Sequence, residues 1–160
     1  MSTTERLGGT APWSPPAGVQ HVGPGTPTLA RLLRSKDVSL ASASRRIEEG
    51  LPFRLFSELA EQLGITHASL AAYLRISEST LYRRRAAGRF DPTESDRLWR
   101  YLVLYGRAVD VLESQAAAVE WLSAPLAALG DASPLTVARD VPGATRALAV
   151  LGRIEHGVFG

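Results

Sequence analysis

From residue 28 onward, apolar residues recur every three or four positions along most of the chain. This spacing predicts a series of α-helices. No segment alternates apolar and polar residues for long, so the pattern does not indicate a sheet. The expected helices cover residues 29–33, a segment ending at Gly50, 52–63, 66–76, 77–88, a long segment after Asp91, 116–122, 135–138 and 144–154. The fold class expected from the pattern is therefore all-α.

Local signals at the helix ends support these boundaries. Pro52 suits the first turn of a helix, and Gly64 suits its end. Asp91, Pro92 and Glu94 form the start of the long helix as N-cap, first and third residue. The apolar face of the long helix reads Leu98, Tyr101, Leu102, Tyr105, Val109 and Leu112.

Residues 1–28 differ from the rest of the chain, because they contain five prolines and five glycines. Such a segment buries too little apolar surface to offset its ordering entropy, so we expect it to be disordered. We expect a helical N-terminal part at 29–90, with a helix-turn-helix at 66–88. A second helical part, for dimerisation and partner binding, is expected at 91–160.

The composition, with 45% apolar residues in 160, allows a core to form and limits the function classes. The chain has no cysteine, no apolar run of about 18 residues and no visible secretory signal, so we expect a cytoplasmic protein that does not contact a membrane. The three histidines, at 21, 67 and 156, are scattered, and no metal-ligand spacing or glycine-rich phosphate loop occurs. We therefore expect no enzyme activity, no cofactor and no metal.

Charge is unevenly distributed, although the net charge is only +2. Residues 75–107 carry eight arginines and four acids, whereas 108–160 carry three arginines and six acids. A basic middle segment favours a polyanion such as DNA. The alternative is a solvated face stabilised by ion pairs.

Residues 69–85 (SLAAYLRISESTLYRRR) have the spacing of two short helices that cross at a wide angle. Ala71 leaves room for the crossing, Leu70, Leu74 and Leu81 are apolar, and Ser77 can cap the second helix. This spacing resembles the helix-turn-helix of DNA-binding repressors. Arg75 stands where the turn usually has glycine, so we expect the turn to be altered. The alternative is a purely structural helical hairpin.

If the motif binds DNA, its second helix faces the major groove. Glu78, Ser79, Tyr82 and Arg83 lie on the outer side near its N-terminus, where base edges are usually met, and Arg83 is the best candidate to read a base. The later arginines are expected at phosphates. The full set of expected DNA-binding residues is Ser77, Glu78, Ser79, Tyr82, Arg83, Arg84, Arg85 and Arg89. The alternative is that the arginines solvate the helix or pair with acids of a neighbouring subunit.

Three further stretches follow the helix-turn-helix in order. They are residues 88–98 (GRFDPTESDRL), residues 118–130 (AVEWLSAPLAALG) with 133–135 (SPL), and residues 151–159 (LGRIEHGVF). Together they make residues 55–160 resemble the Xre/MbcA/ParS antitoxin family, whose partner toxins carry the RES domain. The resemblance implies a helical, usually dimeric antitoxin that represses its own operon. It also implies that the C-terminal part blocks the active site of a toxin that uses NAD.

The resemblance directs attention to the end of the chain. The expected toxin-binding residues are Arg153, Ile154, Glu155, His156, Gly157, Val158 and Phe159. Glu155 suits a cationic diphosphate pocket, and Val158 and Phe159 suit an apolar slot. The alternative is that Ile154 and Phe159 fold back onto the protein's own core.

We also expect a homodimer held by the long helix. Its aromatic and aliphatic stripe consists of Leu98, Trp99, Tyr101, Leu102 and Tyr105, and aromatic residues are enriched at interface centres. The alternative is that these residues serve the monomer's core. Two alternatives for the whole chain also stay open: a transcription regulator without a toxin partner, and an enzyme.

Overall fold

The computed structural model describes Leu29, Leu32 and residues 40–157. The predicted disordered segment 1–28 lies outside the described residues. The helices are α2 (Leu40–Glu49), α3 (Phe53–Leu63), α4 (His67–Tyr73), α5 (Glu78–Ala87), α6 (Pro92–Leu112), α7 (Gln115–Ser123), the 3-10 helix η1 (Ala127–Leu129), α8 (Pro134–Val137) and α9 (Val141–Glu155). The described residues contain no strand, so the predicted all-α class is confirmed.

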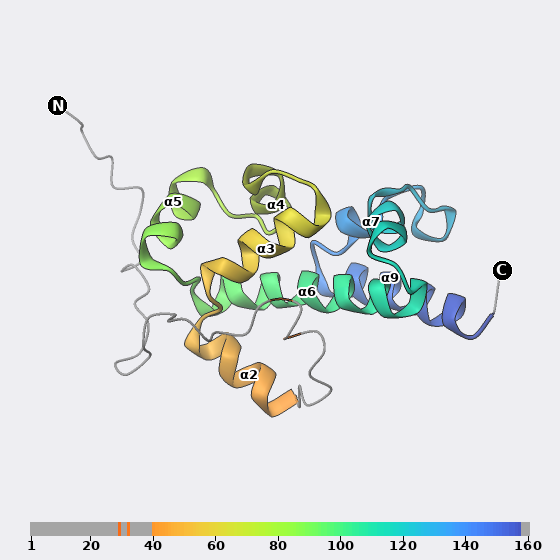
Figure 1. Cartoon of the computed structure of the whole chain (residues 1–160), viewed down its shortest axis with the longest axis horizontal. Coiled ribbons are helices and arrows are strands. Elements are labelled where there is room, and N and C mark those ends of the chain that lie inside the picture. The colour runs from red at the N-terminus through yellow and green to blue at the C-terminus, as the bar shows by residue number, and fades with distance from the viewer. Residues whose placement is uncertain (1–28, 30–31, 33–39, 158–160) are drawn as a thin grey trace.

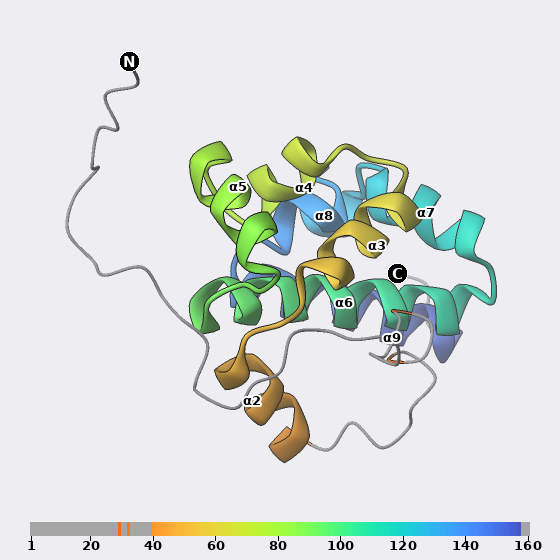
Figure 2. The ribbon, with the colours of Figure 1, turned by 60° about the vertical axis from the view of Figure 1, so that its left-hand side comes forward.

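Helix α6 is the axis of the molecule (Figure 1). It contacts α2 on one side and α7 along its C-terminal half, and α9 runs beside it from Asp96 to Arg107. Helices α3, α4 and α5 cover another side, with α5 at the N-terminal end of α6 (Figure 2). At 21 residues, α6 is about 30 Å long at 1.5 Å per residue. It therefore separates the two ends of the molecule by that distance.

The helix starts follow the capping signals in the sequence. Asp91 and Glu94 form the predicted capping box: the Glu94 amide donates to Asp91 Oδ1 at 2.7 Å, and the Asp91 amide donates to Glu94 Oε2 at 3.0 Å. Gly64 ends α3 with φ 66°, a left-handed conformation in which glycine has no Cβ penalty. Two starts differ from the prediction. Pro52 is the N-cap of α3, and α9 begins at Val141, three residues earlier than expected, because the Asp140 carboxylate caps the Gly143 amide at 2.7 Å.

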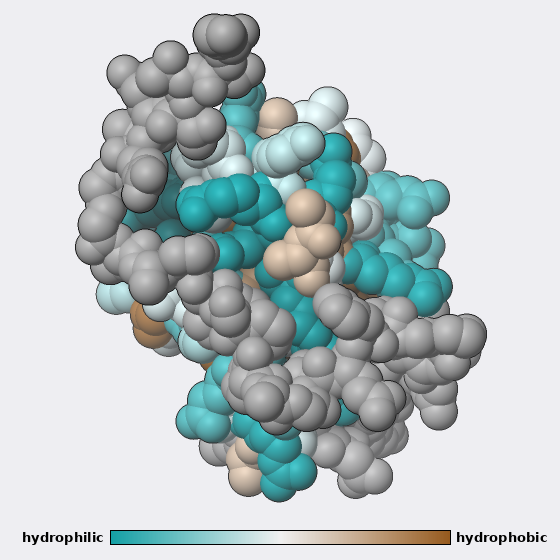
Figure 3. Space-filling view, turned by 90° about the vertical axis from the view of Figure 1, so that its left-hand side faces the viewer, coloured by the Kyte–Doolittle hydropathy of each residue, from teal (hydrophilic) through white to brown (hydrophobic). Residues whose placement is uncertain are grey.

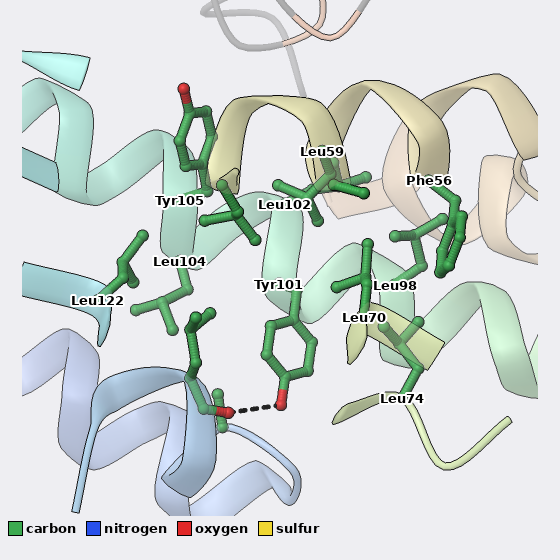
Figure 4. Packing of buried hydrophobic residues seen from close by; sticks show 14 of the residues in the cluster. Phe56, Leu59, Leu70, Leu74, Leu98, Tyr101, Leu102, Leu104, Tyr105 and Leu122 are labelled. Carbon is green, nitrogen blue, oxygen red and sulfur yellow. Dashed lines mark hydrogen bonds between the residues drawn. The ribbon is translucent and has the colours of Figure 1, made fainter. Parts of the chain in front are cut away.

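The predicted dimer stripe on α6 is largely wrong. Tyr101, Leu102 and Tyr105 are at most 2% exposed and Leu98 is fully buried, all within a single chain. They pack against Leu59, Leu70 and Leu122 from three other helices (Figure 4). The Tyr101 hydroxyl donates to the Leu135 carbonyl at 2.8 Å, which joins α6 to α8. These side chains serve the monomer's core because neighbouring helices cover α6 on several sides.

A single core serves both predicted parts of the chain. The cluster of buried apolar residues extends from Leu29 to Leu151 and includes members from the helix-turn-helix, from α6 and from α9. Trp99 is the exception among the predicted interface residues, because it is only partly buried. The predicted boundary between residues 90 and 91 therefore joins two units that share one core.

Candidate functional site

Helices α4 and α5 form the predicted helix-turn-helix. Thr66 caps α4 by accepting the Ser69 amide at 3.0 Å, and Ser77 caps α5 by accepting the Thr80 amide at 3.2 Å. Leu70, Leu74 and Leu81 are buried between the helices, as the spacing predicts. The motif is therefore held by two hydroxyl caps and by apolar side chains that belong to the core shared with α6 (Figure 4).

The turn between the two helices keeps the conformation that glycine favours, so the expectation of an altered turn is wrong. Arg75 has φ 56°, which costs a residue with a Cβ about 1–2 kcal/mol. Arg97 on α6 donates to the Leu74 carbonyl at 3.2 Å and to the Arg75 carbonyl at 3.5 Å. These hydrogen bonds hold the strained turn, and no pattern in the sequence predicted them.

Arg84 is not exposed for the phosphate contact that the sequence predicted. It is 6% exposed, and its guanidinium donates to both carboxylate oxygens of Glu94, at 2.6 and 3.1 Å. It also reaches Asp91 Oδ2 at 3.3 Å. Arg84 therefore joins α5 to the capped start of α6 and is removed from the DNA-binding set. Its acidic partners belong to the same chain, not to a neighbouring subunit.

Arg89 is also engaged within the chain. It is half-buried, and its Nη1 donates to the Gly50 carbonyl at 2.7 Å. The backbone at Arg89 forms an isolated bridge with Pro52, which fixes the segment between α5 and α6 against the start of α3. Arg89 has a structural role, so its predicted phosphate contact has no support from this geometry.

The remaining predicted residues of α5 are exposed on one surface. They are Ser77, Glu78, Ser79, Tyr82, Arg83 and Arg85. Tyr82 is 73% exposed, so its ring is accessible to a partner. The end of the molecule where α5 lies is largely hydrophilic where its surface is described (Figure 3). These side chains lie on the second helix of the helix-turn-helix, on the side that faces away from the core.

Arg85 is anchored from α3 and α4. Its guanidinium lies 5.6 Å from the ring centroid of Phe53 and 3.0 Å from His67 Nδ1. Burial, together with the charge of Arg85, lowers the pKa of His67. The imidazole is therefore neutral at neutral pH, and its Nδ1 can accept the hydrogen bond from Arg85. The side chain of Arg85 is therefore positioned by α3 and α4 while it remains exposed.

The C-terminal end of α9 lies at the opposite end of α6 from α5 (Figure 1). Arg153, Glu155, His156 and Gly157 are exposed, whereas Ile154 packs partly against the core, as the fold-back alternative states. Arg107 on α6 binds both oxygens of Glu155. Arg107 was not predicted as a site residue, because its partner lies 48 residues away along the chain. Val158 and Phe159 lie outside the described residues.

A shallow groove of about 260 Å³ runs between α6 and α9. Its apolar lining includes Val103 and Val141, which are 40% and 61% exposed, and the partly buried Trp99 and Leu148. Asp96 and Arg100 lie on α6 at its edge, one helical turn apart. These apolar side chains gather in one groove, and a contiguous apolar patch is the kind of exposed surface that marks an interaction site.

The described residues show neither a metal centre nor a membrane span. They contain no cluster of three or more acidic, histidine or cysteine side chains able to hold a metal ion. None of the helices in this part of the chain is long and apolar enough to cross a membrane.

Comparison with known families assigns both halves of the molecule. Residues 42–103 match the antitoxin Xre-like helix-turn-helix domain. Residues 107–157 match the antitoxin Xre/MbcA/ParS C-terminal toxin-binding domain. The chain belongs to the Xre/MbcA/ParS antitoxin family. The junction between the two matched segments falls within α6, which agrees with the shared core.

Two curated relatives carry the name Antitoxin Xre. The chain is 38% identical to the one from Yersinia enterocolitica over 84 residues, which cover 52% of this chain and 57% of that protein. It is 28% identical to the one from Photorhabdus laumondii over 117 residues, which cover 70% of this chain and 77% of the relative. The match to the Yersinia protein thus spans little more than half of its length.

Proposed function

We propose that the chain is the antitoxin of a type II toxin–antitoxin pair whose toxin carries a RES domain and uses NAD. The observation that carries the proposal is the order of two matched segments on one chain, a helix-turn-helix and then a toxin-binding domain. The geometry supports two partners, because the surface of α5 and the end of α9 lie about one α6 length apart. A regulator without a toxin would leave the second segment without a role.

The toxin is blocked by residues 153–159 entering its active-site cleft. A cleft that accepts NAD needs cationic groups for the diphosphate, and a carboxylate forms strong charge-assisted hydrogen bonds with such groups. Glu155 is exposed at the end of α9, and its carboxylate is held toward α6 by the guanidinium of Arg107, which shows that the position accepts a cationic partner. In the complex, a cationic group of the toxin replaces Arg107 as the partner of the Glu155 carboxylate or binds the carboxylate together with Arg107. Val158 and Phe159 fill the apolar slot next to the diphosphate pocket.

Truncation tests this mechanism. Removing residues 153–160 deletes only the last turn of α9 and the end beyond it, so the core through Leu151 stays intact. We expect the truncated chain to fold and to bind DNA while the toxin regains its NAD-dependent activity in a mixed assay. Arg146→Ala, an exposed change on the same helix, is the matched control and should neutralise fully. Full neutralisation by the truncated chain would contradict the mechanism, and loss of folding would favour the fold-back alternative.

The chain also binds operator DNA through α5. Arg83 contacts bases and Arg85 contacts a phosphate, because base edges are met near the start of a recognition helix and phosphates toward its end. Arg83→Gln should reduce the ratio of operator to random-DNA affinity. Arg85→Gln should weaken both affinities equally and lower the salt slope by roughly one unit, because one phosphate fewer is neutralised. Fluorescence anisotropy across a salt series measures both, with Arg146→Gln as the charge-matched control. Unchanged operator binding in both variants would reject α5 as the DNA surface.

The homodimer forms through the groove between α6 and α9. The apolar contact is made by Val103, Val141 and Trp99. The other residues of the predicted stripe on α6 are buried in the core of the monomer and cannot contribute. The second copy is the favoured occupant because the groove edge carries an acid, Asp96, and a base, Arg100, which pair at 3.5 Å within the chain and can also pair across a two-fold axis. When two α6 helices meet antiparallel about a two-fold axis, the acid of each copy faces the base of the other, so the surface is self-complementary.

Light scattering tests the dimer. The full chain should have twice its 17.2 kDa mass at low micromolar concentration. Val141→Asp should give a monomer, and an acid at the first position of α9 favours the helix, so folding is retained. Ala149→Asp, exposed on α9 outside the groove, should stay dimeric. A monomeric wild-type chain, or a dimeric Val141→Asp variant, would rule out this interface.

A further inference from the structure

The first turns of α5 present two side chains whose hydrogen-bonding groups are not used within the described residues. Glu78 is the first residue of α5, directly after the Ser77 cap, and Tyr82 follows one helical turn later. Both are exposed, and the described part of the chain offers neither of them a hydrogen bond or an ion pair. Residues four apart share one side of a helix, so the carboxylate and the phenol lie next to each other.

The arginines of α5 have partners within the chain, although Arg83 stays exposed and has one side-chain hydrogen bond. Arg83 Nη2 donates to the Thr80 hydroxyl at 3.2 Å, Arg84 is bound by Glu94, and Arg85 contacts His67 and Phe53. Thr80 in turn accepts from the Ser77 hydroxyl at 3.0 Å. On the flank that holds Glu78, the groups free to meet a ligand are therefore an acceptor-only carboxylate and a phenol.

A carboxylate on a DNA-binding surface opposes general affinity. It is repelled by phosphates, and this repulsion acts on every sequence alike. The carboxylate strengthens binding only where it accepts a hydrogen bond from a donor on a base edge. In the major groove such donors are the amino groups of cytosine and adenine, whereas guanine N7 and O6 and thymine O4 are acceptors that repel it. Glutamate accepting from cytosine N4 is a recurrent pairing.

Tyr82 complements Glu78 on this flank. Its ring is the large apolar group exposed on α5, and in the major groove the 5-methyl group of thymine is the apolar feature available. One helical turn advances 5.4 Å, and a base pair advances 3.4 Å along the duplex, so the two side chains reach positions about one to two base pairs apart.

We propose that Glu78 and Tyr82 determine the specificity of α5 together with Arg83, reading a cytosine and a thymine one or two base pairs apart in each half-site. The inference rests on the proposed DNA binding and adds the base preference. Glu78 acts mainly by rejecting other sequences. Its removal should therefore raise the affinity for a random duplex and lower the affinity for the duplex that the chain prefers. That sign distinguishes it from a residue that merely favours the start of a helix, as any acid does there.

The first step of the test is to determine which DNA sequence the chain binds. The full chain selects duplexes from a randomised library, and anisotropy then gives the dissociation constants for the selected and a scrambled duplex. For Glu78→Gln we expect tighter binding to the scrambled duplex and weaker binding to the selected one. The loss of discrimination should be about 5- to 150-fold, the range for one good base contact. Selection with this variant should lose the cytosine at one position. Glu120→Gln, an exposed change of equal charge on α7, should alter neither duplex.

A change in the DNA tests the proposed contact between Tyr82 and the thymine methyl group. Replacing the selected thymine by deoxyuridine removes only the methyl group, so the wild-type chain should bind several-fold more weakly. Tyr82→Ala should bind both duplexes equally. Equal loss on selected and scrambled duplexes for Glu78→Gln, no loss on either, or a methyl effect that persists in Tyr82→Ala would overturn the proposal. A wild-type chain that selects no sequence would overturn the proposed DNA binding itself, and this proposal with it.

Discussion

Replacing Arg84 by methionine should destabilise the fold by about 3–5 kcal/mol, the usual cost of breaking a buried ion pair from one side. Glu94 is 7% exposed and Asp91 is partly buried, and both lose their cationic partner. Glu94 also supports the capping box of α6, so the start of the central helix loses support. The free energy of unfolding of natural domains is only about 5–15 kcal/mol, so the expected loss is a large fraction of the total stability.

Urea unfolding measures the loss, and two variants control it. Arg83→Met changes the adjacent, exposed arginine and should shift stability by no more than about 0.5 kcal/mol. Adding Glu94→Gln to Arg84→Met removes the unpaired buried charge and should recover part of the loss. Equal stability of the Arg84 and Arg83 variants would show that the ion pair does not hold α5 to α6.

Replacing Gly143 by alanine should cost about 3 kcal/mol, the upper part of the range for overpacking a core. A Cβ at this position would lie 1.7 Å from the Val137 carbonyl oxygen and 2.6 Å from its carbon. The obstacle is backbone, so rotation of a side chain cannot relieve the contact. Helix α9 must move away from α8, which also displaces the toxin-binding end. We therefore expect weaker neutralisation together with the lower unfolding midpoint.

Gly152 on the same helix is the matched control. A Cβ there meets nothing within 4 Å, and alanine is favoured over glycine inside a helix by about 0.5–1 kcal/mol. Gly152→Ala should therefore be neutral or stabilising. If Gly143→Ala is as stable as Gly152→Ala, α8 and α9 do not pack as closely as described.

Features set by a few neighbouring residues could be predicted from the sequence. Asp91, Pro92 and Glu94 indicated the start of α6, Ser77 indicated the start of α5, and Gly64 indicated the end of α3, because caps act within one turn. The apolar spacing of Leu70, Leu74 and Leu81 indicated the helix-turn-helix. The later motifs indicated the family, which the matched segments confirm.

Features set by distant partners could not be predicted. Arg84 resembled its exposed neighbours in sequence, and only the approach of Glu94 buries it. Tyr101 and Tyr105 suggested an interface because one helix face carried many aromatics, yet the positions of α3, α7 and α8 around that face are a tertiary property. Arg97, which holds the turn, and Arg107, which holds Glu155, have partners 22 or more residues away.

The central claim is that this chain neutralises a RES-domain toxin, and the most direct test is to co-express it with the protein encoded in the adjacent reading frame. We predict that the two co-purify as a stable complex, and that the toxin's NAD-dependent activity is absent in the complex and returns when the antitoxin is removed. A RES-domain protein that stays active in the presence of excess chain, with no complex formed, would contradict this claim.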